Sequence, residues 1–260
     1  MMRILDYVHQ MKKELGLRII YQHDNKRGDL AGTMIGYYDR FLGDMMETLE
    51  IPHAYYDYDT MNIHVYMGKD VAMLEESKKK NVIPAQGLKL MREKGKAIVF
   101  VDFTSNDSQG DYQNLFVPER GKTVAECVAE DAYTWNKQYG LEYDGLSALG
   151  LVVGCTHESN GVIRALFPTA THWVPGFGNQ GGGFANYMLE LIRYGKWKGQ
   201  GAIFGNETAM MYAHLEKFGG TGKISDIEKC SKKSVTSFKA DEYNAFQTPK
   251  VKAAGIIYPF

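Results

Sequence analysis

Strand and helix patterns alternate along this chain, and polar and glycine residues follow each strand. Short apolar runs predict strands over 17–23, 59–66, 97–103, 149–154, 171–175 and 201–205. Helix-forming stretches follow them over 30–48, 69–94, 123–138, 158–166, 183–194 and 207–217. Strands that are apolar almost throughout are typical of buried parallel sheets. Repeated units of this kind form either a doubly wound sheet or a (β/α)8 TIM barrel.

The clusters after the strands favour the barrel. They read DNKRGD, TSNDSQGD, GCTHESNG, PGFGNQGGG and FGNET. A barrel spreads its chemistry over the carboxyl ends of many strands, whereas a doubly wound sheet gathers its ligand loops at one switch point. Six units are visible after an amphipathic helix over 3–16, so we expect a barrel that is incomplete at the N-terminus. We expect residues 1–220 to form the barrel domain and residues 221–260 a C-terminal helix and tail packed on it.

Composition narrows the class of protein. The chain has 260 residues with a net charge of −1, which argues against a general nucleic-acid binder. Its three cysteines lack CxxC spacing, which indicates a reducing compartment and no disulfide framework. No apolar run approaches the roughly 20 residues of a membrane span, and the first residues do not resemble a secretory signal. We therefore expect a cytoplasmic protein that binds neither membrane nor nucleic acid.

The segment 24–29 carries an acid, a base and an acid where a strand gives way to a helix. Positions two apart on a strand point the same way, so Asp24 and Lys26 share one face. A lysine beside carboxylates keeps its proton and can act as an aimed cation or proton donor. The structural alternative is a surface ion pair at a helix start, with Asp29 as the N-cap.

Two further loops have binding chemistry and a structural alternative. Glycines in the loop 175–183 allow backbone amides to converge on an anion, and Gln180 adds an amide donor. The same loop can be a purely structural connection. The polar loop 104–111 could contact the edge of a heterocycle, or be an ordinary turn.

Histidine and cysteine give weaker signals. Four histidines lie near strand ends, namely His23, His64, His157 and His172. They form no helical i, i+4 pair, so we expect no metal site. Cys155 follows a buried strand, and we expect a core thiol there and not a nucleophile, since no base can be assigned to it.

Taken together, these loops resemble the orotidine 5′-phosphate decarboxylases, specifically a branch found in many bacteria. The family pattern DxKRGDIxxT is matched by DNKRGDLAGT at 24–33, and its SNP-type loop by TSND at 104–107. The strand VVGAT is similar to VVGCT at 152–156, and the phosphate loop PGxGxQGG to PGFGNQGG at 175–182. The four motifs occur in the family's order and agree with the barrel.

The resemblance implies a cofactor-free conversion of orotidine 5′-phosphate to UMP and CO2 in pyrimidine biosynthesis. Lys26 would stabilise carbanion character at C6 of the pyrimidine and then protonate it. Asp24 would hold Lys26 and lie close to the departing carboxylate. Asp29, with Thr33, would reach across a homodimer interface to the ribose and phosphate of the partner's substrate.

Substrate contacts are implied in the same way. Ser105 would contact the pyrimidine edge, and Gln180, with Gly181 and Gly182 beside it, the phosphate.

Three departures set this chain apart from the family pattern. The family's first two strands carry a substrate-binding aspartate and a further catalytic lysine, and this sequence starts after both. The last strand of the family ends in a phosphate-binding arginine within NSSRxIxYA, where this chain reads GNETAMMYA at 205–213 with Glu207 in that stretch. Asp107 stands where proline is usual.

These departures leave two alternatives open. One is a catalytically impaired or non-catalytic relative that binds a nucleotide or only dimerises. The other is a metal-dependent phosphosugar decarboxylase or aldolase of the same barrel group, although the RGDxxxT context speaks against it.

Overall fold

The computed structural model describes residues 2–17, 20–24, 31–42, 58–76, 85–156, 161–177, 181–215 and 217–256. The chain divides into two compact units, and each is described by itself. Unit 1 comprises residues 1–101 and 138–141, and unit 2 comprises residues 102–137 and 142–260. Among the described residues, no helix combines the length and the apolar character that crossing a membrane requires.

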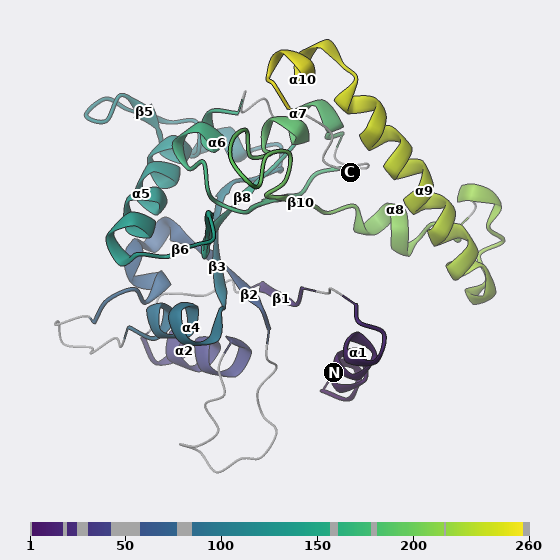
Figure 1. Cartoon of the computed structure of the whole chain (residues 1–260), viewed down its shortest axis with the longest axis horizontal. Helices are drawn as coiled ribbons and strands as arrows, with labels where there is room; N and C mark the ends of the chain where they lie inside the picture. Colours follow the sequence, from purple (N-terminus) through teal and green to yellow (C-terminus); the bar gives the residue numbers. More distant parts are fainter. Residues whose placement is uncertain are drawn as a thin grey trace. The chain divides into compact units, whose positions relative to one another are not determined.

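Six strands form one sheet whose spatial order follows the order of the chain (Figure 1). They are β1 (Gln22–Asp24), β2 (Thr60–His64), β3 (Ala97–Phe103), β8 (Leu149–Val153), β9 (His172–Val174) and β10 (Ala202–Phe204). The pairs β1·β2, β2·β3, β8·β9 and β9·β10 are parallel. In a doubly wound sheet the strand order reverses at a switch point, whereas here the order follows the chain throughout. The predicted fold class is therefore confirmed: the described residues carry six βα units of a (β/α)8 barrel.

Unit 1 has one helix before its first strand and short helical segments between its strands. They are α1 (Met2–Glu14), α2 (Ala31–Tyr37), the π-helical turn η1 (Tyr38–Leu42), the 3-10 turns η2 (Val65–Met67) and η3 (Lys69–Ala72), and α4 (Gln86–Lys94). The buried Tyr38 hydroxyl donates to the Val71 carbonyl at 2.6 Å, which ties η1 to η3. Gly95, with φ of 63°, ends α4 in the left-handed conformation that favours glycine. The helix predicted over 69–94 is thus a 3-10 turn and a separate α-helix within the described residues.

Unit 2 combines its strands with helices and two hairpins. The helices are α5 (Val124–Tyr139), α6 (Val162–Leu166), α7 (Phe184–Leu189), α8 (Glu207–Met211), α9 (Ile227–Phe246) and α10 (Pro249–Ala253), with 3-10 turns η4 (Gln109–Asp111), η6 (Lys217–Gly219) and η7 (Ile224–Asp226). The hairpins are β4 (Phe116–Val117) with β5 (Lys122–Thr123) and β6 (Glu142–Tyr143) with β7 (Leu146–Ser147). All five residues of β8 are buried, as expected of a central parallel strand.

Two predicted helices are shorter than their patterns suggest. α7 ends at Leu189 because the next residue, Glu190, turns into the interior, and three glycines with positive φ follow at Gly195, Gly199 and Gly201. Each of these positions suits a turn and not a helix. α8 ends at Met211, and the chain then turns before Phe218 takes a φ of 59°.

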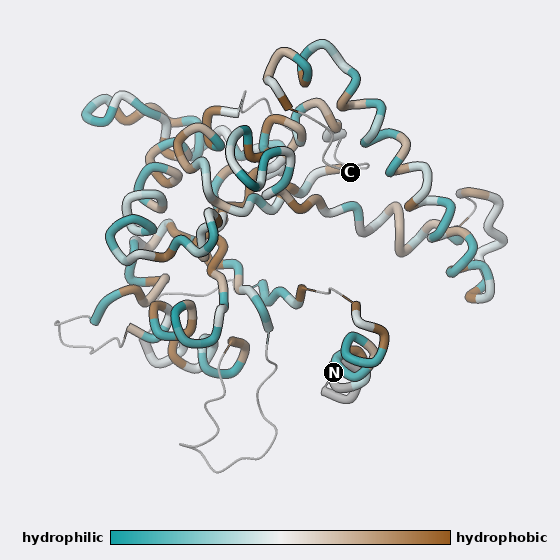
Figure 2. Tube along the Cα trace, viewed as in Figure 1, coloured by the Kyte–Doolittle hydropathy of each residue, from teal (hydrophilic) through white to brown (hydrophobic). Residues whose placement is uncertain are grey.

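The C-terminal helices cover the end of the sheet in unit 2. Five rings pack together at this point, from Phe177, Phe184, Tyr187, Phe204 and Phe238. The Phe204 and Phe238 rings are stacked at 4.3 Å, so α9 is held directly to β10. Along α9, hydrophilic residues alternate with a smaller number of apolar ones (Figure 2). Val251 and Ile256 are buried in the same core.

A fully buried arginine joins several backbone segments of unit 2. The guanidinium of Arg164 donates hydrogen bonds to five carbonyl oxygens, those of Phe167, Pro168, Ala170, Glu190 and Gly201. Burial lowers the pKa of Arg164 to about 10, so the group remains charged at neutral pH. The five acceptors account for the burial of a charge that would otherwise be costly.

A second buried polar feature of unit 2 is a contact between a side chain of β9 and that of the residue directly after α7. His172 Nδ1 lies 2.8 Å from Glu190 Oε2, and both side chains are almost completely buried. Burial, with the Arg164 charge as a second cause, lowers the pKa of His172 to about 4. The contact is therefore a hydrogen bond of a neutral imidazole at neutral pH. Asp102, in unit 2 at the end of β3, is also buried, and neither carboxylate oxygen has a hydrogen-bond partner among the described residues.

Candidate active site

The loops after β3 and β8 touch at the carboxyl ends of their strands. A Cβ built on Gly154 would lie 2.7 Å from the Ser105 nitrogen and 2.8 Å from its Cα, so only glycine fits there. The Thr156 hydroxyl donates to the Ser105 carbonyl at 2.9 Å. The predicted pyrimidine loop is therefore seated on the VVGCT segment.

The loops after β8 and β9 touch in the same way. The Cys155 amide donates to the Pro175 carbonyl at 3.0 Å, and its thiol lies 3.2 Å from the same oxygen. The Gly182 amide donates to the Gly176 carbonyl at 2.9 Å, which closes the glycine-rich loop upon itself. A Cβ on Gly182 would lie 2.3 Å from the Cys155 Sγ. Gly154 and Cys155 thus contact one predicted binding loop each: Gly154 the loop after β3, and Cys155 the glycine-rich loop after β9.

The Cys155 thiol supports these loops and is poorly suited to nucleophilic attack. Burial raises its pKa to about 12, so the thiol stays protonated at neutral pH. Its side chain is almost fully buried beside the glycine-rich loop. This position agrees with the core thiol that the sequence predicts.

A residue that sequence reasoning missed braces the loop at 104–107. Gln113 Oε1 accepts from the Thr104 amide at 2.8 Å, and Gln113 Nε2 donates to the Thr104 hydroxyl at 3.0 Å. The Thr104 hydroxyl also contacts the Asn106 side chain. Ser105 is left half-buried and Asp107 exposed. A glutamine shortly after a polar loop gives no sequence signal that would separate it from any surface glutamine.

Asn186 connects the glycine-rich loop to the C-terminal region. It lies in the first turn of α7, directly after the loop, and its amide donates to the Cys155 carbonyl at 3.1 Å. Lys250 Nζ, on α10, lies 3.5 Å from Asn186 Oδ1. A cation thus reaches the helix that follows the predicted phosphate loop.

In unit 1, Asp24 lies exposed at the carboxyl end of β1. It is opposite Asn62 in the β1·β2 register, and the Asn62 Oδ1 is buried without a hydrogen-bond partner among the described residues. The neighbouring His23 ring stacks on Phe41 with centroids 3.4 Å apart, and its partial burial lowers the His23 pKa. Thr33 is half-buried on α2.

Three of the predicted site residues, Lys26, Asp29 and Gln180, lie outside the described residues. Of the others, Ser105, Gly181 and Gly182 belong to unit 2, where the contacts of Gly154 and Cys155 bring their loops to one place. In the part of the chain that the structure describes, no three His, Cys, Asp or Glu side chains gather as a metal site would require.

The chain is similar to curated orotidine 5′-phosphate decarboxylases. The relative from Rhodopirellula baltica is 29% identical over 192 residues, which cover 74% of this chain and 56% of the relative. The relative from Clostridium botulinum, strain Loch Maree, is 28% identical over 238 residues, covering 91% of this chain and 70% of the relative. The chain thus spans a little over half the length of the first of these relatives. No family model matches it.

Solved structures support the fold. The chain is similar to the crystal structure of orotidine 5′-monophosphate decarboxylase from Plasmodium berghei, with a TM-score of 0.57 and 19% sequence identity. The match covers 93% of this chain and 62% of that one. At this identity the likeness concerns the fold, and it agrees with the strand order of the sheet.

Proposed function

We propose that this chain is an orotidine 5′-phosphate decarboxylase, which converts its substrate to UMP and CO2. The observation that carries the proposal is the joining of three motif segments at the carboxyl ends of β3, β8 and β9 through Gly154 and Cys155. The names of the curated relatives support the same activity. The loop that contacts the base and the loop that contacts the phosphate would then be held at a fixed distance from each other.

The reaction needs stabilisation of a carbanion. The bond from C6 to the carboxylate breaks, CO2 leaves, and the electron pair stays on C6 until a proton arrives. A preorganised ammonium in a dry site stabilises such charge as it develops, and can also supply the proton. We assign this role to Lys26, with Asp24 holding it and lying near the departing carboxylate.

Binding energy far from the reacting carbon supports the chemistry. Contacts to the phosphate can be used to fix the ring and the carboxylate in the reactive position. We assign the phosphate contacts to Gln180, Gly181 and Gly182, and the pyrimidine edge to Ser105.

The family's phosphate-binding arginine has no counterpart after β10, where the chain reads Gly205-Asn206-Glu207. We assign its role to Lys250 of α10. The lysine lies 3.5 Å from Asn186, which follows the glycine-rich loop and binds the Cys155 carbonyl. A cation from the C-terminal helix would then supply the charge that the barrel strand lacks.

The partner and the location belong to the same proposal. We assign Asp29 and Thr33 to the substrate of a second copy, which makes the active form a homodimer. We also propose a cytoplasmic location, in keeping with the free thiols of Cys127, Cys155 and Cys230.

The decisive experiment follows the loss of orotate absorbance when the purified chain is mixed with orotidine 5′-phosphate, with and without a chelator. We expect turnover that the chelator does not change, and its loss in Lys26→Ala. Lys232→Ala removes an exposed lysine from a surface ion pair with Glu228 and should keep full activity.

Each other outcome identifies an alternative. No turnover by a folded native chain would indicate a non-catalytic relative. A requirement for magnesium would favour a metal-dependent decarboxylase or aldolase. Turnover that persists in Lys26→Ala would overturn the assignment of the lysine.

A further inference from the structure

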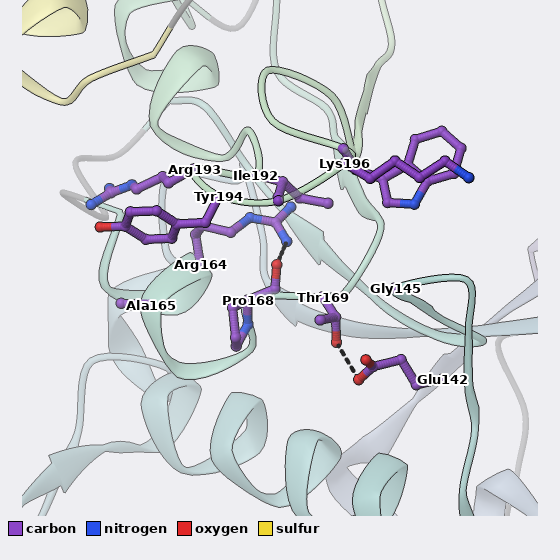
Figure 3. A pocket seen from close by; sticks show the side chains of 12 residues that line it. Glu142, Gly145, Arg164, Ala165, Pro168, Thr169, Ile192, Arg193, Tyr194 and Lys196 are labelled. Atoms are coloured by element: carbon purple, nitrogen blue, oxygen red, sulfur yellow. Dashed lines mark hydrogen bonds between the residues drawn. The ribbon is translucent and has the colours of Figure 1, made fainter.

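Unit 2 contains a pocket at the amino-terminal end of its strands (Figure 3). Its volume is about 420 Å³. Its walls come from the β6–β7 hairpin, from α6 with the turn that follows it, and from the turn between α7 and β10. These segments precede β8, β9 and β10, whereas the loops of the candidate active site follow β3, β8 and β9. The pocket is therefore a different place in the fold.

The pocket wall carries more positive than negative charge. Arg164, Arg193 and Lys196 line it, against the single carboxylate of Glu142. Glu142 is already engaged, since it accepts from Lys137 at 2.9 Å. The charge balance favours an anionic ligand.

The cations of the wall are not equivalent. Arg164 has its donors directed to backbone carbonyls, and Lys196 is paired with Asp144. The Nε of Arg193 is buried and has no hydrogen-bond partner among the described residues. A buried guanidinium donor without an acceptor is costly, and an anion bound at the terminal nitrogens of the same guanidinium would offset part of that cost.

Packing holds Arg193 in place. Its Nη2 occupies the space above Gly161, where a Cβ would lie only 2.1 Å away. Gly161 has a φ of 70° and begins α6, so its own conformation also favours glycine. A guanidinium seated in this way is positioned before any ligand arrives, which lowers the entropic cost of binding.

Aromatic rings complete the lining. Tyr194 is 80% exposed, and Trp197 is half-buried with its Nε1 donating to the Asp144 carbonyl at 2.7 Å. Figure 3 shows Arg193 and Tyr194 extending together to one side of the pocket, with Lys196 on the other. The exposed ring of Tyr194 and the partly exposed ring of Trp197 offer flat faces on which a heterocycle can stack.

We propose that this pocket binds a nucleoside monophosphate, with the phosphate on Arg193 and the base against Tyr194 or Trp197. The volume falls within the range of small-molecule sites, and the lining combines apolar surface with a few polar groups, as such sites do. The proposal is independent of the decarboxylase activity, because it uses none of the residues assigned to that reaction.

Isothermal titration calorimetry on the full chain tests the proposal with AMP, adenosine and inorganic phosphate as probes. We expect AMP to bind more tightly than either of its parts, because only AMP offers both the ring and the anion. Arg193→Gln should weaken AMP binding at least roughly tenfold, the factor for about 1.4 kcal/mol. Lys198→Gln, which removes a charge from the same turn outside the pocket, should leave it unchanged.

Arg193→Lys tests whether weaker AMP binding comes from loss of the guanidinium or from loss of the fold. It keeps the charge but removes the guanidinium, so it should also weaken AMP binding while circular dichroism shows a folded chain. The proposal is overturned if AMP does not bind, if adenosine binds as tightly as AMP, or if both Arg193 variants bind AMP with the native affinity.

Discussion

The sulfur of Cys155 lies directly against the α-carbon of Gly182. A methyl group on Gly182 would be 2.3 Å from the sulfur and 2.5 Å from the Gly176 carbonyl oxygen. Since the Cys155 amide also binds Pro175, the first and last parts of the glycine-rich loop are both held by the end of β8. The position of the proposed phosphate loop thus depends on the absence of a side chain at residue 182.

Gly182→Ala should therefore displace the glycine-rich loop, whereas Gly183→Ala should not. Residue 183 has an extended conformation, with φ of −121°, and a Cβ there would meet nothing within 4 Å. We expect Gly182→Ala to cost about 1–3 kcal/mol of unfolding free energy, as overpacking does, and to reduce turnover at least roughly tenfold. Urea unfolding and the orotate assay measure both effects. Equal behaviour of the two variants would show that the contact is unimportant.

Arg164→Met should destabilise unit 2 strongly. The substitution leaves up to five buried carbonyls without their donor, and each unsatisfied group costs about 1–3 kcal/mol, so we expect a loss of at least about 3 kcal/mol. Arg120→Met is the control in the same unit, because it breaks surface ion pairs with Glu130 and Asp131 that are worth about 1 kcal/mol or less. Similar urea midpoints for the two variants would contradict the structural role of Arg164.

Acid should destabilise the fold through His172. Its pKa falls from an ordinary 6.5 to about 4 in the folded state, chiefly because it is buried. Between these values the unfolded chain binds a proton that the folded chain does not, so stability present above pH 6.5 is lost as the pH falls towards 4. His172→Gln should show a smaller difference between unfolding free energies at pH 7 and pH 4.5. An unchanged difference would mean that His172 titrates normally.

Alkali should destabilise the fold through Asp102. Burial, and secondly the carboxylate of Glu190, raise the pKa of Asp102 well above its usual value. The stability that the protonated acid provides is complete below the unfolded pKa of 3.8 and is lost as the pH rises through the folded value. Asp102→Asn should therefore gain stability relative to the native chain on going from pH 5 to pH 8. Asp241→Asn, an exposed change on α9, should show no such trend. A parallel response of both variants would refute the prediction.

Lys250→Met should raise the KM for orotidine 5′-phosphate by roughly tenfold, the effect of losing one hydrogen bond to a charged group. The turnover number should change less, because the lysine is assigned to binding. Lys252→Met removes an exposed charge from the same helix and serves as the control. A native KM in Lys250→Met would show that Lys250 does not contact the phosphate, and would overturn the assignment.

The strongest sequence patterns predicted the elements around the site. The strand over 97–103 has the predicted bounds, and α5 differs from the predicted helix by one residue at each end. The strand is apolar almost throughout, and in the helix the apolar residues fit a helical period over the whole length. The placement of binding loops at strand ends was also predictable, because parallel strands end at the same edge of a sheet.

One part of the pocket lining, the β6–β7 hairpin, could have been predicted from its turn residues, although its strands show no recognisable pattern. Asp144 and Gly145 have φ of 52° and 83°, as a tight hairpin turn requires, and an Asp-Gly pair is typical of such turns. The strands on either side, β6 and β7, have only two residues each, too few for an alternating pattern to show.

Other features depend on packing that no local pattern encodes. The contact of Cys155 with Gly182 joins residues far apart in the chain. The burial of His172 and Asp102 depends on which face of each strand the helices cover, and on Glu190 leaving α7 to meet His172. The sequence placed His172 near a strand end but could not show that it lies in the interior.

The core that holds the glycine-rich loop has a consequence for synthesis of the protein. It joins Cys155 and Val174 to Val251 and Ile256. During translation, the segment around Cys155 leaves the ribosome well before the residues that complete its core. This core is therefore incomplete until residue 256 has been made, and until then its apolar surface is open to chaperones and to other nascent chains.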